Sequence, residues 1–119
     1  MNTKQKGNEG ERYVGEYLQT EGWRVIEMNF RTQRGEIDII AEKGEQLSFV
    51  EVKSWSLLDA DQLEYAIGSK KQRTIVRCAR EFIASNPKYS NRSVQFDVVL
   101  HRPTGGAPRH LQHAFYGDE

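Results

Sequence analysis

The stretch from Gly35 to Lys53 constrains the fold most, because it joins two strand-like runs through a short polar loop. Residues 36–41 and 47–53 are rich in β-branched and aromatic side chains, and Gly44 lies between the two runs. This pattern predicts an antiparallel β-hairpin with a loop over residues 43–46. The register that follows pairs Glu42 with Leu47, Ile40 with Phe49, Asp38 with Glu51 and Glu36 with Lys53.

The two faces of this predicted hairpin differ in polarity. One face is apolar and carries Ile37, Ile39, Ala41, Ser48, Val50 and Val52. The opposite face is apolar near the turn and charged far from it, where Asp38, Glu51 and Lys53 gather. Such charges can simply pair at a solvated surface. Apolar residues on both sides of a strand, however, are typical of a sheet covered on both faces, where neighbouring carboxylates need a cation.

Two carboxylates suit a hard divalent ion such as Mg²⁺. A lysine beside them would orient an attacking water and offset the charge of a phosphodiester. The residue types at Asp38, Glu51 and Lys53 therefore indicate phosphodiester hydrolysis.

Further motifs carry a family resemblance. They are Gly7, Gly10-Glu11, Asn29-Phe30-Arg31, Gly35-Glu36-Ile37-Asp38, Phe49-Val50-Glu51-Val52-Lys53, Lys71-Gln72 and Phe96-Asp97-Val98-Val99. Together they resemble the YraN family (uncharacterised protein family 0102), within the PD-(D/E)XK nucleases and similar to archaeal Holliday junction resolvases. The resemblance implies a restriction-endonuclease-like α/β domain that uses Mg²⁺ or Mn²⁺. Trp55 stands where the family usually has a basic residue, so a phosphate contact is lost or the indole stacks on a base.

The length of 119 residues predicts a single domain over residues 1–119. The sequence has no hydrophobic run long enough for a signal peptide or a membrane span, so we expect a cytoplasmic protein. Cys78 is the single cysteine, which argues against disulfide and zinc chemistry. The net charge is zero, but residues 36–51 hold five acids and one lysine, whereas residues 70–80 hold five bases and no acid. This separation suits a metal-dependent nuclease better than a protein that coats DNA.

The remaining pattern predicts an α/β layered domain with the order αβββαβ and a short final strand. We expect helices over residues 8–20 and 69–85, a first strand over 23–28, and later strands over 94–100 and 111–116. Residues 29–34 are expected to form a loop, and residues 54–62 a mobile loop beside the site.

Several residues outside the hairpin keep two interpretations. Glu11 lies on the inward stripe of the first helix and either compensates the helix dipole or, as the resemblance implies, completes the metal shell. Arg31 and Arg34 are solvated charges or phosphate contacts. At the start of the second helix, we expect Lys71, Gln72 and Arg73 to contact nucleic acid, and Arg77 and Arg80 to be solvated.

The C-terminal part offers weaker ligand candidates. Asp97 is a further metal ligand or, as we expect, a structural hydrogen-bond acceptor. His110 and His113 have ligand spacing, but the sequence shows no helix or acid near them, so we expect no metal site there.

The leading function is thus a metal-dependent endonuclease for structured or branched DNA. The alternatives are a nucleic-acid-binding module that acts with a partner in DNA processing or uptake, and a protein-interaction domain with charges only on its surface. A junction resolvase needs two sites, which predicts a homodimer.

Overall fold

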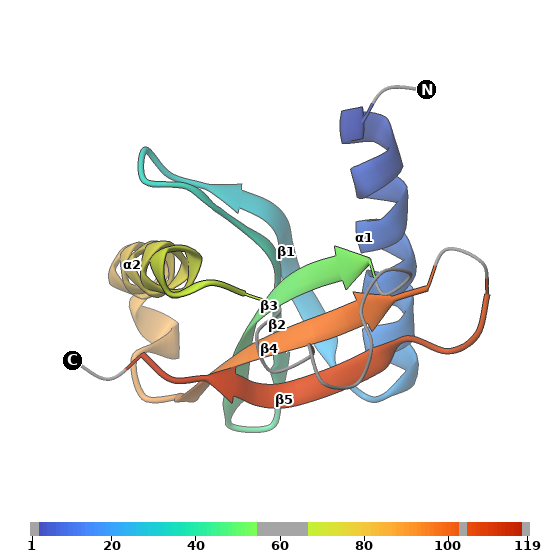
Figure 1. Cartoon of the computed structure of the whole chain (residues 1–119). Coiled ribbons are helices and arrows are strands. Elements are labelled where there is room, and N and C mark those ends of the chain that lie inside the picture. The colour runs from blue at the N-terminus through green and yellow to red at the C-terminus, as the bar shows by residue number, and fades with distance from the viewer. Residues whose placement is uncertain (1–2, 55–66, 103–104, 118–119) are drawn as a thin grey trace.

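The structure is a computed structural model that describes residues 3–54, 67–102 and 105–117. The elements, in order, are α1 (Thr3–Thr20), β1 (Arg24–Arg31), β2 (Glu36–Lys43), β3 (Gln46–Ser54), α2 (Ser69–Ser85), a 3₁₀ turn (Pro87–Tyr89), β4 (Ser93–His101) and β5 (Arg109–Phe115). The five strands form one sheet in the order β1-β2-β3-β4-β5 (Figure 1). Strands β3 and β4 are parallel, with α2 in their connection, and the other neighbours are antiparallel. The predicted mixed α/β class is confirmed.

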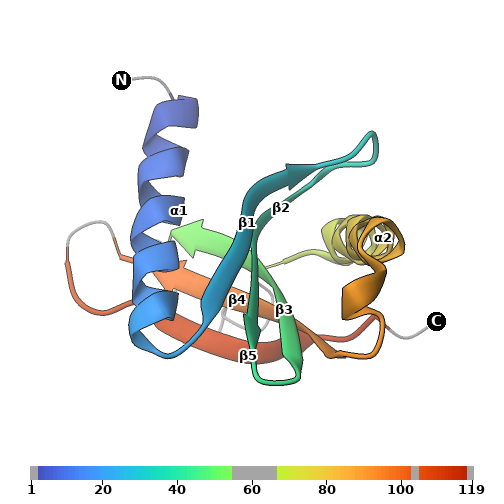
Figure 2. The ribbon, with the colours of Figure 1, turned by 180° about the vertical axis from the view of Figure 1, so that it is seen from behind.

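The sheet is buried on both faces because each helix presents an apolar stripe to it. Helix α1 buries Val14 and Leu18 in a cluster with Ile39, Ala41, Val50 and Val99. Helix α2 buries Ile75, Ala79 and Phe82 in a second cluster with Ile40, Leu47, Phe49 and Val98. The two helices are seen on either side of the strands in Figures 1 and 2. Neither helix, over its described residues, is long and apolar enough to cross a membrane.

The predicted register of the β2–β3 hairpin is confirmed at the pairs Ile40–Phe49 and Glu42–Leu47. The ladder ends at Ile39 opposite Val50, one pair short of Asp38. There the Asp38 carboxylate oxygen Oδ2 accepts a hydrogen bond from the Val52 amide at 2.8 Å, so a side chain takes the place of a backbone acceptor. Strand β2 therefore parts from β3 at Asp38.

The predicted pair between Glu36 and Lys53 is wrong for the same reason. Beyond the point of separation, β2 pairs only with β1, where Glu36 lies opposite Arg31. The two side chains form an ion pair at 3.1 Å.

The regular alternation of faces breaks at Asn29, which lies between two residues of opposite orientation. Met28 packs with the α1 cluster, whereas Phe30 packs with the α2 cluster and its ring lies 5.3 Å from that of Phe82. Asn29 has a left-handed backbone with φ of 57°. Ile37, in the partner strand, likewise joins the α2 cluster, so its predicted place on the face of Ile39 is wrong.

Several element boundaries also differ from the sequence prediction. Helix α1 begins at Thr3, five residues earlier than expected. Strand β1 extends to Arg31, so residues 29–31 belong to a strand, and the connection to β2 spans only residues 32–35. Strand β5 begins at Arg109, two residues earlier than expected. Most of the predicted mobile loop, including Trp55, lies outside the described residues, and Ser54 ends β3.

Candidate metal and nucleic-acid site

Three carboxyl groups from three elements meet where β2 leaves β3. Asp38 and Glu51 are 8% and 5% exposed, respectively. The charge of Asp38 acts on both Glu51 of β3 and Glu11 of α1, so the three carboxyl groups lie near one another. The structure therefore brings together the three acids that the sequence analysis singled out. We call Glu11, Asp38 and Glu51 the carboxylate cluster.

The protonation of the carboxylate cluster reflects burial and crowding. Burial, and then the nearby charge of Asp38, raise the pKa of Glu51 to about 7. The same two causes, in the same order, raise the pKa of Glu11 to about 7. Near neutral pH the cluster thus retains protons that an added cation would replace.

Asn29 is a site residue that the sequence analysis missed. Its side-chain amide lies near Glu11 and acts to lower the pKa of that glutamate, against the larger effects of burial and Asp38. Its left-handed backbone lies in the middle of a strand, a conformation that costs roughly 1 kcal/mol or more outside glycine and that collects at functional sites. The sequence signal was slight, since asparagine is merely one of the residues that tolerate this conformation.

The lysine that contacts the carboxylate cluster is Lys71, whereas Lys53 was the lysine expected there. The ammonium group of Lys71, from the first turn of α2, forms an ion pair with Glu51. Strand alternation places Lys53 on the same face as Glu51, where it is partly buried and forms no ion pair with the acids of the described residues. Lys71, predicted as a nucleic-acid contact, is thus the direct partner of Glu51.

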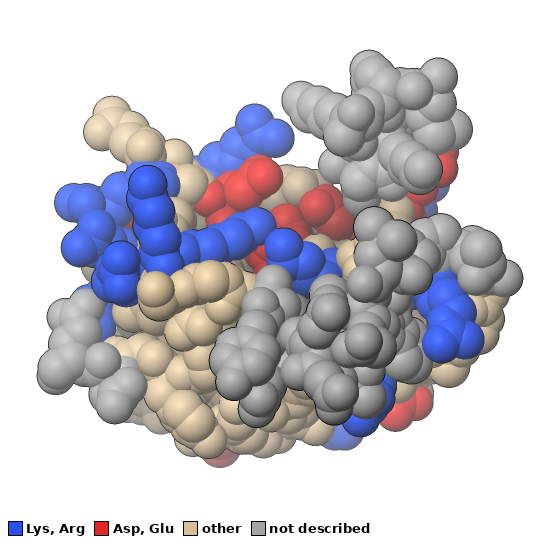
Figure 3. All heavy atoms as spheres, viewed as in Figure 1, with Lys and Arg blue, Asp and Glu red and all other residues tan. Residues whose placement is uncertain are grey.

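The other predicted nucleic-acid contacts lie on the surface around the cluster. Arg31 pairs with Glu36, and Arg34 lies 3.8 Å from Glu81 of α2; both arginine side chains are more than half exposed. Arg73 is exposed on α2. Figure 3 shows lysine and arginine side chains bordering a recessed group of acids. The side-chain amide of Gln72 instead donates a hydrogen bond to the Ile67 carbonyl at 2.9 Å. Gln72 therefore binds the backbone that leads into α2.

Asp97 lies apart from the carboxylate cluster in a buried polar network. It accepts hydrogen bonds from Ser48 Oγ at 2.6 Å and from the His113 amide at 3.0 Å, and it contacts His110 Nε2 at 2.8 Å. Burial would raise the pKa of Asp97, but the hydrogen bonds, that of His110 first, outweigh it and lower the pKa. The hydrogen-bonding role matches expectation. The assumption that no acid lies near His110 and His113 is wrong.

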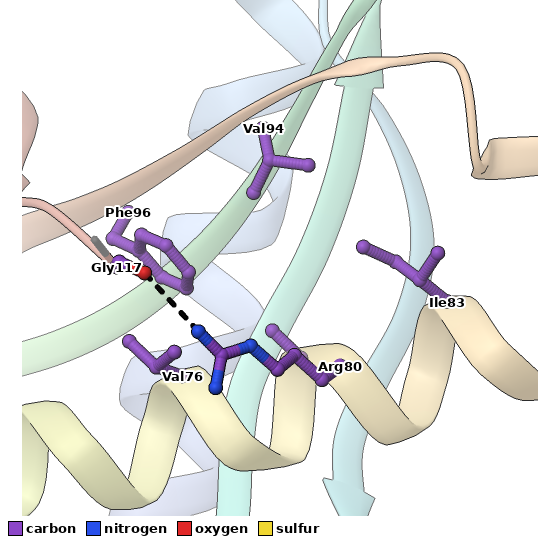
Figure 4. Close-up of a pocket in the computed structure, with 7 residues that line it drawn as sticks. Val76, Arg80, Ile83, Val94, Phe96 and Gly117 are labelled. Carbon is purple, nitrogen blue, oxygen red and sulfur yellow. Dashed lines mark hydrogen bonds between the residues drawn. The ribbon is translucent and has the colours of Figure 1, made fainter. Parts of the chain in front are cut away.

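A separate apolar groove lies between α2 and the start of β4 (Figure 4). It has a volume of about 290 Å³ and is lined by Val76, Ala79, Arg80, Ile83, Val94, Phe96 and Gly117. The Arg80 guanidinium crosses it to donate a hydrogen bond to the Gly117 carbonyl at 3.2 Å. No member of the carboxylate cluster lines this groove, and its apolar walls do not suit a phosphate.

The carboxylate cluster has the donor chemistry for a hard divalent ion, although its side chains are not arranged around one. Within the described part of the chain, no three His, Cys, Asp or Glu side chains are placed to hold a metal ion together. The three acids nevertheless supply oxygen ligands gathered around Asp38, and the buried Oε1 of Glu11 has no hydrogen-bond partner among the described residues. These oxygen donors are the ligand type that Mg²⁺ and Mn²⁺ prefer.

Fold and site together define a mixed α/β protein with a buried carboxylate cluster under a basic rim. The chain belongs to the uncharacterised protein family UPF0102, whose family model matches residues 10–100. The family resemblance seen in the sequence is thereby confirmed. A UPF0102 protein of Treponema denticola is 39% identical over 103 residues, covering 81% of this chain and 79% of the relative. A UPF0102 protein of Rhodopseudomonas palustris is 34% identical over 109 residues, covering 92% and 82%.

Proposed function

We propose that the protein is a Mg²⁺- or Mn²⁺-dependent endonuclease that hydrolyses phosphodiester bonds in structured or branched DNA, on a restriction-endonuclease-like domain. One observation carries the proposal: Glu11, Asp38 and Glu51 converge from α1, β2 and β3 at the point where the sheet divides. Buried acids in contact are costly for stability alone, because like charges repel and lose their hydration. A hard cation offsets both penalties.

In this proposal, each group of residues has its own task. Asp38, Glu51 and Glu11 would hold the ion, which when bound supplies Lewis-acid activation of water and of a phosphoryl oxygen. Lys53, on the face of Glu51, would hold the attacking water and stabilise charge on the phosphate. The exposed bases around the recess, namely Arg31, Arg34, Lys71 and Arg73, would hold the DNA backbone.

A second candidate is a nucleic-acid-binding module of the same fold that cleaves little or not at all and serves a partner protein. One observation favours it. Glu51 is already neutralised by Lys71, so the site as it stands has a cation of its own. Such a protein would keep the basic rim without using the carboxylate cluster for catalysis.

The experiment that separates the two candidates is a cleavage assay on linear, flapped and four-way-junction DNA with Mg²⁺ or Mn²⁺. The endonuclease proposal predicts metal-dependent products from the wild type, with the branched substrates preferred, and none from Asp38→Asn. DNA binding by both proteins with no cleavage of any substrate would favour the binding module. Sedimentation of the protein with a junction would report whether two protomers assemble on it, as a two-site resolvase requires.

A further inference from the structure

Lys71 occupies an unusual position for a lysine. It lies in the first turn of α2, where the helix dipole disfavours positive charge and where the structure shows no acidic residue and no side-chain cap. Its own helix therefore gives its charge no compensation. The compensating partner is Glu51, 20 residues earlier in the chain and 5% exposed.

More than one acid near the carboxylate cluster affects the pKa of Lys71. Burial lowers the pKa of Lys71, but the hydrogen bond and charge of Glu51 outweigh that effect, with further contributions from Asp38 and Glu36, so the pKa is raised. The lysine side chain is 49% exposed even so. Its ammonium group thus contacts a buried acid although about half of the side chain is exposed to solvent.

We propose that Lys71 holds the cation position of the carboxylate cluster until a divalent ion displaces it from Glu51, and that the released ammonium group then contacts a phosphate of the bound nucleic acid. The inference rests on the proposed function. It follows from competition, because the Lys71 ammonium occupies Oε2 of Glu51, one of the two oxygens that this carboxylate offers to a metal ion. Metal loading and nucleic-acid binding are then coupled through one side chain.

The direct test is Mn²⁺ binding to the full chain by titration calorimetry, without nucleic acid. Lys71→Met should bind Mn²⁺ about fivefold or more tightly than the wild type, the scale of one partly exposed ion pair. Lys70→Met is the matched control, since Lys70 is an exposed neighbour in the same turn, and it should bind like the wild type. Binding by Lys71→Met where the wild type binds none would also support the proposal.

Equal or weaker Mn²⁺ binding by Lys71→Met would overturn the inference, and the wild type's own cleavage would then decide the proposed function separately. If neither protein bound Mn²⁺, both would fall. Thermal unfolding of each variant checks its fold, and Lys71→Gln gives a second variant if Lys71→Met is unstable.

A second readout is DNA affinity with Ca²⁺, or with a chelator, in place of the catalytic ion. The loss of affinity caused by Lys71→Met should be larger with Ca²⁺ than with the chelator, because only the displaced lysine is free to meet a phosphate. A surface lysine that merely adds charge would give the same loss under both conditions, and that result would contradict the proposal.

Discussion

At the residue scale, the two glutamates of the carboxylate cluster link the site to stability. Glu11 and Glu51 have pKa values of about 7 in the folded protein, against an ordinary value of 4.5. Between these values the folded state binds more protons than the unfolded chain, so stability falls as pH rises. The metal-free protein should therefore unfold at a lower urea concentration at pH 8 than at pH 5.

Two comparisons isolate the cause. Glu51→Gln removes one titrating group, so its unfolding midpoint should depend less on pH than that of the wild type. Asp97 does not interfere, because its pKa is lowered in the folded protein. The stability that ionised Asp97 contributes is lost only at acidic pH, below the ordinary pKa of 3.8. A wild-type midpoint that rises from pH 5 to pH 8 would show that the two carboxyls are solvated and not crowded.

Some of these residues could be found from the sequence and others could not. The register places Ile39 opposite Val50, and its extension by one pair brings Asp38 toward Glu51, although the ladder itself ends before that pair. The contact between Lys71 and Glu51 could not be derived that way, since it depends on where the connection after β3 delivers α2. Asn29 was missed because a left-handed residue inside a strand leaves no trace in hydrophobic periodicity.

At the element scale, the β1–β2 hairpin and α2 hold one side of the site together. A Cβ atom added at Gly35 would lie 2.6 Å from Thr74 Cγ2, so the turn approaches α2 as closely as its backbone allows. The same turn places Thr32 Oγ1 3.3 Å from Cys78 Sγ. These contacts hold the turn between β1 and β2 against the middle of α2, where Arg34 lies near Glu81.

Gly35→Ala should therefore destabilise the fold by about 2 kcal/mol through overpacking. The measurement is urea unfolding, and the matched test is the double variant Gly35→Ala with Thr74→Ser, which removes the clashing methyl group and should restore part of the loss. Thr74→Ser alone provides the reference. If the double variant were as unstable as the sum of the two single changes, α2 would not be the cause.

The fold was predictable at this scale wherever local patterns decide it. Both helices, the hairpin and the strand before the C-terminal turn follow from periodicity and turn residues. The separation of β2 from β3 did not follow, because it depends on a side chain, Asp38, that replaces a backbone acceptor. That separation lies at Asp38, the residue that Glu11 of α1 approaches.

At the scale of the whole molecule, a chain without net charge gathers a group of acids in one place and a group of bases around it. The acids lie in a recess, and the bases of α2 and the hairpin border it (Figure 3). A chain without net charge gains little from general attraction to DNA, so binding should depend on this local arrangement. The proposed endonuclease function requires that this recess is a catalytic site and not a neutralised surface.

The test of this requirement is single-turnover cleavage of a preferred DNA substrate. It compares the wild type with Lys53→Met and Asp38→Asn. Lys53→Met keeps much of the stem's volume, so it should retain metal and DNA binding while its cleavage rate falls about 10²-fold or more, the scale of one electrostatic catalytic group. Asp38→Asn should lose metal affinity as well. Equal metal-dependent cleavage rates for all three proteins would contradict the proposed catalytic site. Any cleavage would then belong to another site.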